Sequence, residues 1–123
     1  MTAPNIVNVT SIIGKTVYDS DVATSDATLV DTVTTDKILK INTIIAANID
    51  GSAAATISVW VALGSGAAAF YLAKTVTVPA DSSLVIISKD TSFYLEEGLR
   101  IRALASTAGD ISLMCSYEEI DDA

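Results

Sequence analysis

Residues 55–63 read Ala55-Thr56-Ile57-Ser58-Val59-Trp60-Val61-Ala62-Leu63. Apolar side chains recur at every odd position, and small or polar residues and one tryptophan lie between them. A period of two residues is typical of a β-strand that buries one face, because successive side chains of a strand point to opposite sides. This stretch therefore predicts a β-strand.

Similar runs lie on both sides of it, at residues 39–45, 70–78, 99–103 and 111–118, with weaker ones at 6–13 and 28–34. The short apolar run at 84–87 suggests a strand covered on both faces. Turn residues such as Asp50-Gly51-Ser52 and Gly64-Ser65-Gly66 separate the runs. About eight strands with turns every ~8–12 residues predict an all-β fold, an antiparallel β-sandwich that is jelly-roll-like. The 123 residues suit one such domain, residues 1–123.

The composition excludes several classes of function. There are 7 Lys+Arg against 15 Asp+Glu, a net charge of −8, which disfavours nucleic acid and anionic membrane surfaces as partners. Residues 51–73 carry no charge, but their Gly, Ser and Thr content argues against a membrane span. Histidine is absent and Cys115 is the single cysteine, so histidine-dependent catalysis, an intrachain disulfide and cysteine metal clusters are all excluded. We therefore expect no enzyme, no cofactor and no metal.

The remaining polar residues are better explained by structural roles than by catalysis or metal binding. The acidic loop 19–26 could offer oxygens to Ca²⁺, but it lacks the bend glycine and the bidentate glutamate, which favours a solvated turn. The pairs Glu96-Glu97 and Glu118-Glu119 are expected to straddle their sheet, since neighbours in a strand point to opposite faces. Cys115 lies on the apolar side of the last run and is predicted to be a buried structural thiol.

Four larger side chains are interface candidates: Trp60, Tyr71, Tyr94 and Met114. Trp60 falls on the face opposite Ile57 and Val59, where a wet surface would not favour tryptophan. Either the sandwich curls so that both faces are partly covered, or subunits pack there, since aromatic residues and Met are enriched at interfaces. The low charged content of 18% favours an oligomer.

The second half of the chain carries a recognisable series of segments: Tyr71-Leu72-Ala73-Lys74, Val78-Pro79-Ala80-Asp81-Ser82-Ser83-Leu84, Tyr94-Leu95-Glu96-Glu97-Gly98, Ala105-Ser106-Thr107-Ala108-Gly109 and Ser116-Tyr117-Glu118-Glu119-Ile120. Upstream, Lys40-Ile41-Asn42-Thr43-Ile44-Ile45-Ala46-Ala47-Asn48 precedes an Asp-Gly turn. Over residues 27–120 this series resembles small virion structural proteins of tailed bacteriophages, including cyanophages. One departure is Leu99 after Gly98, where such relatives often have Asp.

The resemblance implies a β-sandwich subunit without enzymatic activity that acts in the virion. The first expectation is a capsid decoration, or cement, protein: a homotrimer on the outside of the phage head that bridges major capsid subunits, with residues 1–13 as a contact arm. Its location would be the capsid surface, after assembly in the host cytoplasm. The alternative is a tail, neck, baseplate or fibre subunit. A second alternative is a carbohydrate-binding module, which would require Trp60 and Tyr71 to face solvent.

Overall fold

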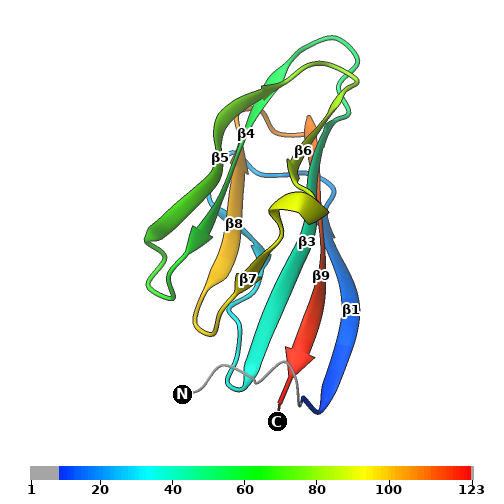
Figure 1. The fold of residues 1–123 in the computed structure, drawn as a ribbon. Coiled ribbons are helices and arrows are strands. Elements are labelled where there is room, and N and C mark those ends of the chain that lie inside the picture. Colours follow the sequence, from blue (N-terminus) through cyan, green and yellow to red (C-terminus); the bar gives the residue numbers. More distant parts are fainter. Residues whose placement is uncertain (1–8, 123) are drawn as a thin grey trace.

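Two antiparallel sheets face each other in the computed structural model, which describes residues 9–122 (Figure 1). The first sheet has the order β1-β9-β3-β6, with β7 also paired to β3, and the second has the order β2-β8-β4-β5. The strand bounds are β1 Ser11–Asp19, β2 Ala27–Val30, β3 Lys37–Asn48, β4 Ala55–Ala62, β5 Ala68–Val78, β6 Ser83–Ile87, β7 Phe93–Leu95, β8 Arg100–Ala105 and β9 Ile111–Asp121.

Strands β6 and β7 share one position in the first sheet. β6 pairs with residues 44–47 of β3 and β7 with residues 39–41, and the short 3₁₀ turn η1 (Lys89–Thr91) separates them. Counting these two as one interrupted strand leaves eight positions, four in each sheet, as in a jelly roll. The predicted antiparallel sandwich of about eight strands is confirmed.

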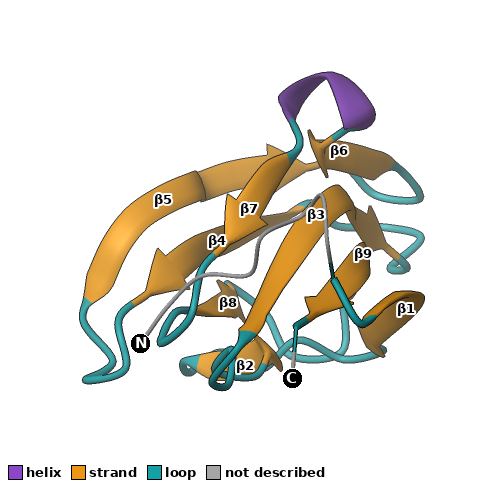
Figure 2. Cartoon of the chain, turned by 60° about the horizontal axis from the view of Figure 1, so that its bottom comes forward, coloured by secondary structure: helices purple, strands orange, loops and turns teal. Residues whose placement is uncertain are grey.

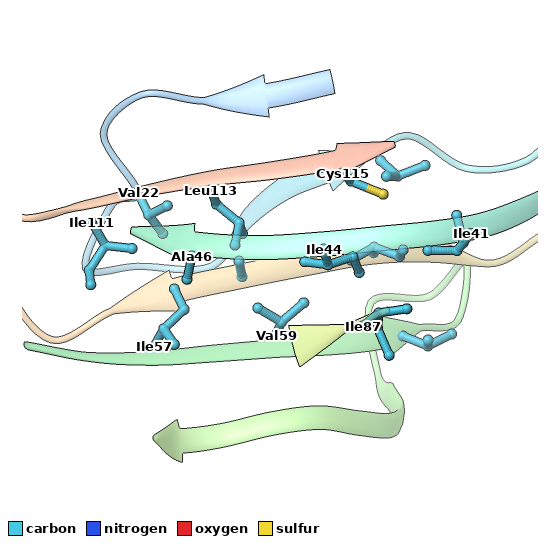
Figure 3. Packing of buried hydrophobic residues seen from close by; sticks show 14 of the residues in the cluster. Val22, Ile41, Ile44, Ala46, Ile57, Val59, Ile87, Ile111, Leu113 and Cys115 are labelled. Carbon is cyan, nitrogen blue, oxygen red and sulfur yellow. The ribbon is translucent and has the colours of Figure 1, made fainter. Parts of the chain in front are cut away.

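The core lies between the sheets and is built from the alternating residues of each strand. Figure 3 shows Ile57 and Val59 of β4 pointing towards Ile44 and Ala46 of β3. All four are fully buried. The period of two around Trp60 predicts this for Ile57 and Val59, but the alternation of residues 39–45 predicts Ile45 as the inner residue; a register shift between Ile41 and Thr43 turns Ile44 inward instead. Each buried Ile or Val contributes roughly 1.5–3 kcal/mol relative to an exposed one. Strand β9 adds Ile111, Leu113 and Cys115 to the same cluster.

Some local predictions were wrong. The run at 84–87 is not covered on both faces: Val85 is 56% exposed, because β6 lies at the edge of its sheet. The strand expected at 28–34 ends at Val30. Of the strand expected at 6–13, residues 11–13 belong to β1, which runs on to Asp19; residues 6–8 lie outside the described residues.

The N-terminal contact arm falls only partly within the described residues. Residues 11–13 belong to β1 and pair with residues 119–121 of β9 in the same chain. Residues 1–8 lie outside the part of the chain that the structure describes. For residues 1–8 the arm therefore stays a prediction.

Loops gather at both ends of the sandwich. At the end drawn uppermost in Figure 1, the side chain of Asn48 is 2% exposed and closes the β3–β4 loop. Its Nδ2 donates to the carbonyl oxygens of Ala53 and Val78, at 3.0 and 2.9 Å, and its Oδ1 accepts from the Asp50 amide at 2.9 Å.

The charge-free stretch 51–73 contains all of β4 and the start of β5. Among the described residues, no helix has the length and apolar character needed to cross a membrane.

Candidate interaction surfaces

Trp60 is a core-like residue on the outer face of the second sheet. It is only 3% exposed, and its ring centroid lies 5.5 Å from that of Tyr71, its cross-strand partner on β5. Its partner on the other side is Arg102 of β8. Tyr71 is 41% exposed, with the Lys74 ammonium 5.0 Å from its ring centre. Of the two explanations for Trp60, cover within one chain therefore accounts for its burial.

The other two candidates lie elsewhere. Tyr94 is 45% exposed on β7, opposite Lys40 of β3. Met114 is half-buried on β9 and lines a shallow hollow of about 290 Å³ together with Tyr18, its partner on β1. The structure thus brings Trp60 and Tyr71 together and leaves Tyr94 and Met114 at separate places.

A larger groove runs along the open side of the sandwich, between β5 and β7, which Figure 2 shows on the same side of the molecule. We call it the edge groove; its volume is about 470 Å³. Its wall includes Phe70, 68% exposed, and Tyr94. None of its lining residues carries a charge; they are Val61, Ala69, Phe70, Leu72, Ile87, Thr91, Phe93, Tyr94, Leu95 and Leu99.

Exposed apolar side chains concentrate on the edges of the sheets. Among the described residues nine large hydrophobic side chains are exposed, and seven of them lie on the edge strands β1, β5, β6 or β7, whereas the edge strand β2 carries none. These seven are Ile12, Ile13, Tyr18, Phe70, Tyr71, Val85 and Tyr94. Strand β5 has one charged residue, Lys74, in eleven. Edge strands normally carry charge, bulges or other devices against pairing with further chains. β5 has bulges in its pairing with β4, which disfavour strand pairing, but its exposed apolar side chains remain available to pack against another chain.

The two glutamate pairs lie in different surroundings. Glu96 and Glu97 lie in the turn after β7 and not in a strand, contrary to expectation. On β9, Glu118 accepts a hydrogen bond from Asn42 at 3.1 Å, and Glu119 accepts one from Lys15 at 3.0 Å. The Lys15 ammonium, despite an opposing effect of burial, holds the pKa of Glu119 below its usual value.

The acidic loop 19–26 is tied down by turn hydrogen bonds. Asp19 accepts from the backbone amide of Asp21, and Asp21 accepts from the amide of Gly109 at 2.7 Å. Among the described residues, no group of three or more His, Cys, Asp or Glu side chains is arranged to hold a metal ion.

Cys115 is a buried thiol, as predicted. It is 0% exposed on the inner side of β9, and burial raises its pKa to about 12. At neutral pH the sulfur is therefore protonated and covered, so it offers no thiolate for catalysis or for a bond to another chain.

Comparison with known proteins identifies no family. No protein family model matches the chain, and no curated protein matches it. Among solved structures, it is similar to one described with the words "Bacillus endospore appendages form a novel family of disulfide-linked pili". The alignment covers 92% of this chain and 90% of the other, with 18% identity and a TM-score of 0.49. Identity this low says nothing about what the present chain binds.

Sequence reasoning missed two features of these surfaces. Phe70 shares its alternating run with Leu72, which predicts an inner position, yet it is exposed because the edge groove is open there. The alternation of Arg100 and Arg102 with Ile101 places both arginines on one face of β8, but it does not predict that they approach the β4–β5 turn. That alternation was the signal available in the sequence.

Proposed function

We propose that this chain is a non-enzymatic structural protein of a tailed-phage virion, a decoration protein that binds the outside of the head and stabilises contacts between major capsid subunits. The observation that carries the proposal is the concentration of exposed apolar side chains on free sheet edges. Apolar side chains gathered on an exposed surface are typical of sites that bind another protein, because assembly buries them.

The edge groove is the surface proposed to contact the capsid. It is apolar and uncharged on a chain of net charge −8. It can therefore approach another protein without repulsion between like charges across the contact. Phe70 and Tyr94 are its exposed aromatic side chains, the type that dominates interface energies. Each contact can be weak, because several copies in a homotrimer attach to a lattice at once.

A location in the virion is supported by the resemblance of residues 27–120 to small virion proteins. The carbohydrate-binding alternative is weakened by Trp60. A sugar stacks on an exposed aromatic face, and the indole of Trp60 is 3% exposed under its neighbours. The tail, neck, baseplate or fibre alternative places the same edges in a different part of the virion.

Immunogold labelling of intact virions with an antibody to this chain tests the proposal. Dense labelling over the head is expected, together with earlier rupture on heating of heads that lack the protein. Label confined to the tail or neck would refute the decoration role. Absence of the chain from purified virions would refute a virion role altogether.

A further inference from the structure

Two guanidinium groups converge on the outer face of the second sheet. Arg100 and Arg102 lie two residues apart on β8, and both approach Gly66 in the β4–β5 turn. A Cβ atom placed on Gly66 would lie 3.3 Å from Nη2 of Arg100 and 3.8 Å from Nη1 of Arg102. Two positive groups so close together repel each other unless an anion lies between them.

Neither arginine has an acidic partner among the described residues. The ion pairs there involve Lys15 and Lys37. Arg102 donates one hydrogen bond, from Nη2 to the backbone oxygen of Asp26 at 3.2 Å. The Nε atoms of both arginines, like Oε2 of Glu97, are buried without a hydrogen-bond partner. Buried polar atoms are nearly always paired in folded proteins, so the hydrogen bonding of this arginine pair is incomplete within one chain.

The surrounding face is positive on an otherwise acidic chain. The strands β2, β4, β5 and β8 contain Arg100, Arg102 and Lys74 and no Asp or Glu. The Lys74 ammonium lies over the ring of Tyr71, and Tyr71 packs on Trp60. Trp60 belongs to β4, which lies between β5 and β8. Paired guanidinium groups suit carboxylates, because their N–H donors match both carboxylate oxygens.

The opposite end of the same molecule supplies carboxylates. Asp21, Asp50, Asp81 and Asp110 lie in the loops β1–β2, β3–β4, β5–β6 and β8–β9, and we call them the acidic end. Asp81 donates its amide to the Asp50 carbonyl at 3.1 Å. Burial, followed by the charge and hydrogen bond of Asp50 and the charge of Asp21, raises the pKa of Asp110. Carboxylates crowded in this way are stabilised by an arriving cation.

We infer that Arg100 and Arg102 form a carboxylate-binding site that receives the acidic end of a second copy of this chain. The charges of the two surfaces are complementary, and the two lie at opposite ends of the sandwich, so the contact is head-to-tail. A head-to-tail contact closes into a ring when the rotation between copies permits and extends into a filament when it does not, so the homotrimer of the proposed function requires the closing rotation. The inference deepens that proposal by naming the contact between copies.

Sedimentation of the whole chain tests the inference without virions. The variant Arg100→Met/Arg102→Met removes the donors but keeps an apolar stem beside Trp60. The variant Asp50→Asn/Asp81→Asn/Asp110→Asn removes charge from the acidic end but keeps its hydrogen-bonding oxygens. Lys40→Met/Lys89→Met is the matched control, because it removes two cations outside the second sheet.

We expect the wild type and the lysine control to associate, and each of the other variants to associate at least roughly tenfold more weakly. Mixing the arginine and aspartate variants should give a 1:1 complex that grows no further, because one competent contact remains in the mixture. A monomeric wild type, an arginine variant that associates like the wild type, or an equal loss in the control would each overturn the inference. If the arginine variant does not fold, the self-association of the aspartate variant alone tests the inference. Head labelling of virions is unaffected by any of these outcomes.

Discussion

Replacing Phe70 by Ser should weaken head binding strongly and leave the fold intact. Phe70 is 68% exposed in the edge groove. A phenylalanine side chain offers on the order of 200 Å², so about 140 Å² remains to be buried by a partner. At roughly 25 cal/mol per Å² this is worth at most about 3.5 kcal/mol per copy, or between two and three orders of magnitude in Kd. Because little of the ring contacts its own core, the unfolding free energy should change by less than about 1 kcal/mol.

The assay is rebinding of purified protein to heads that lack it, measured by co-sedimentation over a concentration series. Ile49→Ser is the matched control, since Ile49 is 59% exposed but lies in the β3–β4 loop and not in the groove. Wild-type binding by Phe70→Ser would refute the groove as the contact surface. An equal loss for both variants would mean that general surface hydrophobicity, and not this site, drives binding. Strong destabilisation by Phe70→Ser would show that Phe70 belongs to the core.

Three further predictions concern the sandwich itself. Asn48→Ala should lower the unfolding free energy by about 2–4 kcal/mol in urea denaturation, because it leaves buried carbonyl groups unpaired; a change below about 1 kcal/mol would contradict the role given to this amide. The thiol of Cys115 should resist a disulfide reagent at pH 8 in the native chain and react fully in denaturant, and rapid native reaction would contradict its burial. The pKa of Glu119 is lower folded than unfolded, so the stability it contributes is complete above its unfolded pKa and is lost as pH falls through the folded one. The stability difference between wild type and Lys15→Met should therefore be present at neutral pH and shrink in acid, and a difference independent of pH would exclude this ion pair as its source.

The central strands were predictable because the side chains on their two faces differ in type. Ile57 and Val59 alternate with polar or covered residues, so the period of two is explicit. Strand β7 was missed since three residues are too few to show a period. The end of β1 was missed because its side chains are mostly exposed and mix polar with apolar types. Edge position depends on which strands pair, which a local pattern does not contain.

The surfaces were predictable only in part for the same reason. Cys115 was placed correctly because it continues the alternation of Ile111 and Leu113, whose side chains are apolar. Trp60 was placed on the right face, but its cover comes from Tyr71 on a neighbouring strand, and that pairing is set by the tertiary register. The approach of Arg100 to Gly66 brings together residues 34 positions apart in the chain, which no spacing rule reveals.

Two kinds of contact on one acidic chain predict opposite responses to salt. Copies with a net charge of −8 repel each other at long range, and salt screens that repulsion, which favours apolar contacts such as the edge groove. Salt also screens attraction between Arg100 or Arg102 and carboxylates, which weakens the head-to-tail contact. Self-association of the wild type should therefore decrease as NaCl rises, whereas binding to heads through the groove should hold or increase. Measuring both between low and roughly physiological ionic strength separates the surfaces without any substitution. A fall of head binding in parallel with self-association would mean that charge, and not the apolar edge, holds the protein on the particle.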